Sequence, residues 1–334
     1  MEKKRLSLIC VCFLVICFTL FSVTASGAEI VQKREEFASS FTKVRDDLSL
    51  ECRLKIGHIN GNTIYEISGS EYGGWKSKLK FPMNNSLIGG RVSLNYSNDG
   101  WGDYSFNLGG WVSLAEKSAG TMEDSDWLYA YSSGKAIYSE SDAEMDTRIF
   151  DGNILFNFLK ESYPERKQSL ILGARIGYKY QKFDYNISDT EQIDYISYYY
   201  IFVPGKTLNY EVEYRIPYLG LNGIYSFGNA FKANLEVNYS PWVKAEDKDD
   251  HLLRNKLSKG DCEGNLFMAG GNLSWEFEKN WTWEIGISYT TISTQGEQEQ
   301  YFYGGEYKGL SFHNIDDKIN SRQVFVSTSI KYRF

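Results

Sequence analysis

The stretch "WTWEIGISY", residues 281–289, alternates apolar and polar side chains at every second position. One set holds the large apolar residues, Trp281, Trp283, Ile285, Ile287 and Tyr289. The other set holds Thr282, Glu284, Gly286 and Ser288. Successive side chains on a β-strand point to opposite faces, so this pattern predicts a strand with one apolar face and one polar face.

The same alternation recurs along the chain, in residues 104–114, 208–216, 231–239 and 324–334. Lysine, glutamate and arginine on one face suit a polar lumen, while tyrosine, tryptophan, valine and leucine on the other suit lipid. The chain contains 25 Tyr, 20 Phe and 8 Trp but only 5 Pro, as expected where aromatic girdles line both lipid interfaces. Every backbone group in hydrocarbon must be paired within the protein, so the sheet must close. The sequence therefore predicts an all-β, antiparallel transmembrane β-barrel.

Ten strands are expected, near 47–62, 75–97, 104–115, 147–161, 168–186, 208–227, 231–246, 263–278, 281–294 and 321–334. Short connections between them belong in the periplasm. Long connections, near 63–74, 116–146, 187–207, 247–262 and 295–320, belong outside the cell. Several strands exceed the roughly 9–11 residues that cross a bilayer, so the barrel should extend above the outer membrane. Ten strands enclose little open space, which makes a small channel the least favoured function.

The two ends of the chain carry sorting signals. Residues 1–28 have a basic start, an apolar run and small residues before Glu29, which predicts an export signal peptide. Residues 29–45 are expected to form a periplasmic N-terminal tail, and residues 46–334 the barrel. The terminal Phe334, with Tyr332 two positions before it, resembles the signal read by the outer-membrane barrel assembly machinery. The formal net charge of −7 argues against nucleic acid as a partner.

Two acidic stretches stand where long outer connections are expected. In "TMEDSDW", residues 121–127, Asp124 and Asp126 lie two apart, so their carboxylates point the same way in an extended chain. In "AEDKDDH", residues 245–251, Asp247, Asp249 and His251 follow the same spacing. A water molecule held between the two groups could lose its proton to His251 while Asp249 orients the ring. Two other interpretations remain open: a solvated acidic surface, or oxygen ligands for calcium.

At these two stretches the sequence resembles the omptins, ten-stranded outer-membrane endopeptidases of Gram-negative bacteria. Residues 109–127 are similar to a glycine–tryptophan strand that leads into a Met-x-Asp-x-Asp-Trp motif. Residues 239–251 are similar to a Tyr-Ser-x-Trp-Val strand followed by Asp-x-Asp-x-His. The resemblance covers roughly 46–334 and implies an aspartic-type endopeptidase with polypeptide substrates, no metal and no cofactor. It also implies that Asp124 and Asp126 form the aspartate pair, and that Asp249 and His251 form the dyad.

The sequence departs from the family at two places. Omptins usually cut beside basic residues, which two acids bind; Asp247 matches one of these acids, and the other falls near Asn62. A family site for lipopolysaccharide keeps Lys182, whereas Glu213 stands where a cation is expected. A basic preference and a lipopolysaccharide requirement, in the setting of outer-membrane lipid, are therefore both open expectations.

The main alternative is a non-enzymatic barrel that acts as an adhesin or surface-binding protein, because a fold does not fix a function. The other two histidines of the mature chain, His58 and His313, match nothing catalytic. Cys52 and Cys262 could pair in an oxidising compartment, but nothing in the sequence brings them together.

Overall fold

The computed structural model describes residues 48–70, 73–97, 102–115 and 117–334. Its strands belong to one compact unit, Asp47–Arg333. The expected signal peptide, and nearly all of the residues before the barrel, lie outside the described part of the chain and stay predictions.

Within the described part, the chain forms eleven strands and two short 3-10 helices. The strands are β1 (Leu48–Gly69), β2 (Trp75–Tyr96), β3 (Asp103–Ser113), β4 (Lys117–Leu128), β5 (Ile137–Tyr163), β6 (Gln168–Asp194), β7 (Tyr199–Phe227), β8 (Phe231–His251), β9 (Lys256–Glu278), β10 (Trp281–Phe302) and β11 (Ser311–Arg333). The helices are η2 (Pro164–Arg166) and η3 (Leu252–Arg254). No helix among these residues is long and apolar enough to cross a membrane.

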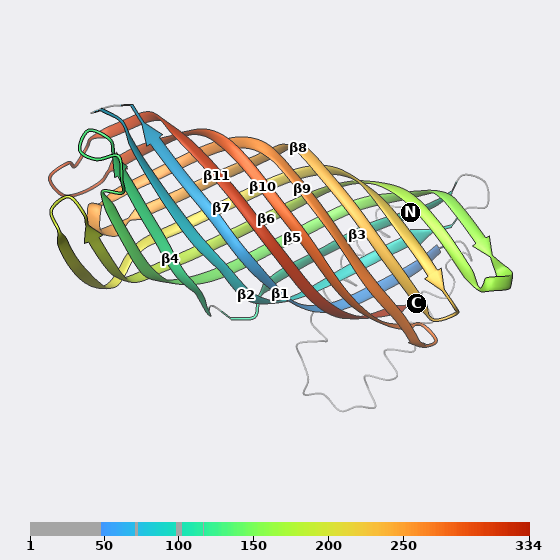
Figure 1. Cartoon of the computed structure of the whole chain (residues 1–334). Helices are drawn as coiled ribbons and strands as arrows, with labels where there is room; N and C mark the ends of the chain where they lie inside the picture. Colours follow the sequence, from blue (N-terminus) through green and yellow to red (C-terminus); the bar gives the residue numbers. More distant parts are fainter. Residues whose placement is uncertain (1–47, 71–72, 98–101, 116) are drawn as a thin grey trace, which may run out of the picture. The chain divides into compact units, whose positions relative to one another are not determined.

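The strands form one closed antiparallel sheet (Figure 1). The first and last strands close it: β1 pairs with β11 from Glu51↔Arg333 to Ser68↔Asp316, and with β2 along its other edge. Both β3 and β4 lie between β2 and β5, so they are successive segments of one barrel strand. The ring therefore has ten strand positions, and the predicted fold class is confirmed.

The strand that is split into β3 and β4 also contains a bulge. The pairing of β4 with β5 shifts register between Ser118 and Gly120, and Gly120 has a φ of 118°, which L side chains rarely adopt. A bulge bends a strand and changes the direction of the side chains beyond it. The residues beyond this bulge include Asp124 and Asp126.

The strands extend much further outward than the sequence indicated. The expected long loop 247–262 is a turn at 252–255 between β8 and β9, and 187–207 contracts to residues 195–198. The expectation of long outer loops was therefore wrong. Above the membrane the outer face of a strand contacts water, so both faces carry polar residues and the alternation disappears from the sequence. In the structure it persists as burial, with buried and exposed residues alternating along β8 up to Asp249.

Large apolar side chains cover the outside of the barrel at one level. Leu54 and Ile56 on β1, and Ile285 and Ile287 on β10, are between 43% and 58% exposed. Towards the short turns, Phe227, Phe231 and Trp275 form a stacked row, with ring centroids 5.7 and 6.4 Å apart. These are the outward apolar band and the aromatic girdle expected of a barrel in lipid.

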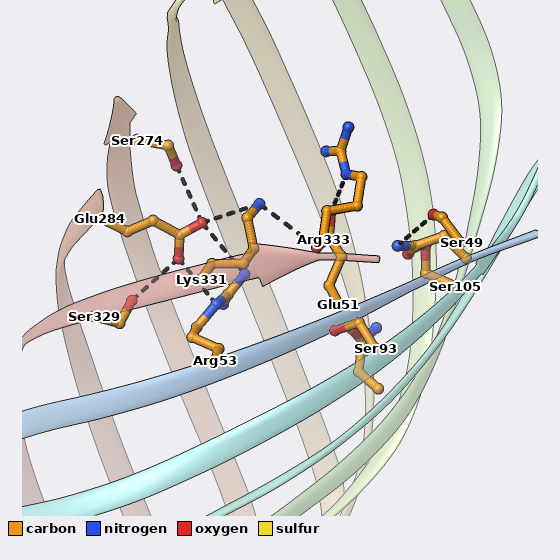
Figure 2. Close-up of polar contacts among 12 residues, drawn as sticks. Ser49, Glu51, Arg53, Ser93, Ser105, Ser274, Glu284, Ser329, Lys331 and Arg333 are labelled. Atoms are coloured by element: carbon orange, nitrogen blue, oxygen red, sulfur yellow. Dashed lines mark hydrogen bonds and ion pairs between the residues drawn. The ribbon is translucent and has the colours of Figure 1, made fainter. Parts of the chain in front are cut away.

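Paired charges occupy the lumen near the short turns. Figure 2 shows Glu284 of β10 and Glu51 of β1 joined through Lys331 of β11. Arg53 Nε lies 3.1 Å from Glu284 Oε2, and Arg333 Nε lies 3.0 Å from Glu51 Oε1. Side chains therefore fill the barrel interior at this level, which argues against an open channel.

Aromatic side chains fill the lumen above the membrane level. The rings of Phe81 and Tyr210 stack at 4.1 Å, and Tyr65 and Tyr185 pack against this pair. All four side chains are at most 2% exposed. This aromatic layer forms the floor of the acidic site described next.

Candidate active site

Strand β4 carries Asp124 and Asp126 on its inner face. Asp124 pairs in register with Leu79 of β2, which is 1% exposed inside the barrel, and Met122 on the same face of β4 is 4% exposed. Ser77 Oγ lies 3.5 Å from Asp124 Oδ1 and donates a long hydrogen bond to it. Because side chains alternate along a strand, Asp126 points inward as well.

Strand β8 carries Asp247, Asp249 and His251 on its inner face. Asp247 and Asp249 are 5% and 1% exposed, whereas Lys248 between them faces outward. His251 is the last residue of the strand, and its Nε2 lies 3.4 Å from Asp249 Oδ2. The predicted Asp–His contact is therefore present.

The two acidic groups interact across the lumen. The β4 and β8 strands are separated by β5, β6 and β7 around the ring. Burial, followed by the negative charge of Asp126, raises the pKa of Asp124 to about 8, and the charge of Asp249 contributes in the same direction. Below pH 8 the aspartate pair therefore retains a proton, because two desolvated carboxylates repel each other.

The dyad has the opposite protonation pattern. Burial lowers the pKa of His251 below its ordinary value, despite the opposing effect of Asp249. Burial tends to raise the pKa of Asp249, but the charge and hydrogen bond of His251 outweigh it and the pKa falls. At neutral pH the structure thus combines a neutral imidazole, able to accept a proton, with an ionised carboxylate that orients it.

Two cations beside the dyad were missed in the sequence. Lys256 opens β9, pairs in register with His251 and is 6% exposed, and Arg254 lies in the η3 turn between them. Both lower the pKa of His251 and of Asp249. The sequence signal was present, since Lys256 follows His251 by five residues, but only a tight turn brings it back beside the dyad.

Asn62, the position that the resemblance assigns to the second pocket acid, does not face Asp247 in the lumen. Asn62 lies on the outer face of β1, next to the buried Thr63, and pairs with the exposed Arg322 of β11. Tyr65 lies on the inner face of β1 instead, and its hydroxyl donates a 2.7 Å hydrogen bond to Gln298 Oε1.

The remaining candidates lie apart from this site. His58 is exposed and its Nδ1 lies 3.3 Å from Ser86 Oγ; the exposed His313 contacts Glu299. Cys52 and Cys262 are both free thiols. Among the described residues, no three His, Cys, Asp or Glu side chains are arranged to hold a metal ion.

Comparison with known proteins identifies relatives along most of the chain. The model of the Omptin family matches residues 45–334. The outer membrane protease OmpP of Escherichia coli K12 is 27% identical over 247 residues, which are 70% of this chain and 73% of OmpP. The plasminogen activator of Yersinia pestis is 24% identical over 303 residues, 86% of this chain and 90% of that protein.

A solved structure supports the fold independently. The crystal structure of the outer membrane protease OmpT from Escherichia coli superposes with a TM-score of 0.75 at 19% identity, over 88% of this chain and 100% of that one. The predicted outer-membrane location is confirmed by the relatives, several of which are named outer membrane proteases. The family match extends over nearly all of the described residues, and the chain belongs to the Omptin family.

Proposed function

We propose that this protein is an outer-membrane endopeptidase that hydrolyses polypeptides outside the cell with an activated water molecule. The observation that carries the proposal is the contact between His251 and Asp249 on one inner wall, opposite the protonated Asp124–Asp126 pair. Proteases among the relatives support the same reaction class. The water acts directly on the peptide, so no acyl-enzyme forms.

The contact geometry suggests a role for each atom. With His251 Nε2 directed at Asp249, Nδ1 remains to accept the proton of the attacking water. The water oxygen bonds to the carbonyl carbon of the peptide, and the Asp124–Asp126 pair holds this water in position. When the tetrahedral intermediate collapses, the C–N bond breaks and the imidazolium returns its proton to the leaving amine. Ionised Asp249 stabilises the imidazolium in between.

We further propose a preference for substrates with a basic side chain beside the cleaved bond. Asp247 supports this preference, because it faces the lumen two residues before Asp249 and has no cation bound to it within the described residues. A buried carboxylate without a partner is unfavourable, so a guanidinium or ammonium group would be bound strongly there.

We propose that the activity of this protein requires lipopolysaccharide only weakly. Lys182, on the outer face of β6, is already bound by three carboxylates: Glu211 at 2.8 Å, Glu213 at 3.2 Å and Asp184 at 3.6 Å. A lipid phosphate would have to compete with all three. The exposed apolar band contacts membrane lipid, and Phe334 remains the proposed recognition element for the assembly machinery.

The test uses the full mature chain, refolded in lipid, and a fluorogenic peptide with paired basic residues. His251→Ala should lower kcat/KM by about 10²–10⁴-fold, the usual contribution of a general base. His313→Ala is the matched control, because His313 is exposed and lies apart from the dyad. Equal activity of the wild type and the His251 variant would refute the mechanism. Binding to surface polymers by a protein that cleaves no peptide would favour the adhesin alternative.

A further inference from the structure

A second buried carboxylate meets Asp247 inside the barrel. Asp317 is on β11, which β9 and β10 separate from β8, and β9 has Gly260 at the level of Asp247. A methyl group on Gly260 would overlap both Asp247 Oδ1 and Asp317 Oδ2. The two carboxyl groups therefore converge over this glycine.

The carboxyl groups of this pair have no cationic partner in the part of the chain that the structure describes. Asp247 and Asp317 are 5% and 1% exposed, and none of their four carboxylate oxygens has a hydrogen-bond partner among the described residues. The neighbouring Gln298 Nε2 and Tyr210 hydroxyl are also buried and unpaired. Buried polar groups in proteins nearly always have partners, so this concentration of unsatisfied groups points to a polar ligand as their partner.

The position of the pair relative to the dyad defines the ligand. Asp247 precedes Asp249 by two residues on an extended strand, which places it about 7 Å further down the strand and therefore deeper in the lumen. A peptide lying with its backbone at His251 could reach that depth with one long side chain. Arginine and lysine have this length, and their charge matches two carboxylates.

We propose that Asp317 is a specificity-determining residue that, together with Asp247, binds the cationic side chain next to the cleaved bond. This inference rests on the proposed peptidase function. A guanidinium can donate to both carboxylates at once, and charge-assisted hydrogen bonds of this kind are among the strongest in proteins. Tyr65 and Tyr210 close the sides of the subsite.

The protonation of the two carboxyl groups agrees with this role. Burial raises the pKa of Asp317 to about 6, and burial together with the charge of Asp317 raises the pKa of Asp247 well above its ordinary value. The carboxyl pair therefore retains a proton in mildly acidic solution. A bound guanidinium would replace that proton as the compensating positive charge.

The first experiment compares two peptides that differ only in arginine or citrulline beside the cleaved bond. Citrulline has nearly the same shape as arginine but no charge. In the full refolded chain, Asp317→Asn should lower the arginine-to-citrulline ratio of kcat/KM about 10- to 100-fold, the value of one charge-assisted hydrogen bond. The loss should appear mainly in KM. Asp316→Asn is the matched control, because Asp316 is the adjacent residue on β11 and faces outward.

The second experiment measures binding without hydrolysis. In a His251→Ala background, calorimetry should show that the arginine peptide binds more tightly than the citrulline peptide, and that Asp317→Asn removes the difference. Asp317→Glu, which keeps the charge, should retain most of it. An unchanged preference in the Asp317→Asn protein, in either experiment, would overturn the inference. A wild type that binds with this preference but hydrolyses neither peptide would instead refute only the proposed peptidase activity.

Discussion

His251 Nε2 lies 3.4 Å from Asp249 Oδ2, and both side chains project from the same inner face of β8, two residues apart. Strand geometry alone brings them together, since alternate residues share a face. The loop-like composition of "EDKDDH" does not reveal this, because Glu246, Lys248 and Asp250 alternate with the inward-facing residues and hide their pattern. The dyad therefore depends on a rigid strand end, and a rigid scaffold favours a defined protonation state.

The protonation states predict a bell-shaped pH profile of kcat/KM. The acid limb should fall below pH 6.5, because burial lowers the pKa of His251, and the alkaline limb should lie near pH 8, where Asp124 ionises. In Asp126→Asn the neighbouring charge is lost, the pKa of Asp124 falls, and the alkaline limb should move to lower pH. Rates measured between about pH 4.5 and 10 decide this. An alkaline limb that stays in place in the variant would exclude Asp124 as its origin.

The cation beside the dyad predicts a shift of the other limb. Lys256 lowers the pKa of His251 through its charge. Lys256→Met should therefore raise that pKa and move the acid limb of kcat/KM to higher pH. Lys259→Met provides the control, because Lys259 is on the same strand but exposed. If the acid limb lies at the same pH in the Lys256→Met and Lys259→Met variants, Lys256 does not influence the dyad.

The sequence revealed the strands in lipid but not the strands above it. Between Trp281 and Tyr289 one face contacts hydrocarbon and the other contacts the polar lumen, so residue type alternates with position. Beyond Val243 on β8, water lies outside and charged groups lie inside, and residue type no longer distinguishes the faces. The catalytic candidates could be found because their motifs are local. Asp317 could not, because its partner Asp247 is three strands away and only the folded sheet brings the two together.

The buried acid pair predicts a stability that depends on pH. The pKa of Asp317 is about 6 in the folded barrel and near 4 in the unfolded chain. Between these values the folded state binds more protons, so the free energy of unfolding should fall as pH rises from 4 to 6 and stay low above 6. Asp317→Asn should remove this loss, on the order of 1–3 kcal/mol at pH 8. Urea unfolding in lipid vesicles at pH 4.5 and pH 8 measures it; a variant that is no more stable than wild type at pH 8 would contradict the prediction.

The carboxylates around Lys182 predict how the protein responds to lipopolysaccharide. Replacing both Glu211 and Glu213 by Gln leaves Lys182 with only Asp184, at 3.6 Å. The freed ammonium group can then bind a lipid phosphate, so stimulation of peptide cleavage by added lipopolysaccharide should increase about 2- to 5-fold, the value of a surface ion pair. Glu263→Gln, which removes an exposed carboxylate near Lys244 instead, serves as control. Stimulation that is already maximal in the wild type, and unchanged in the double variant, would show that these carboxylates do not compete with the lipid.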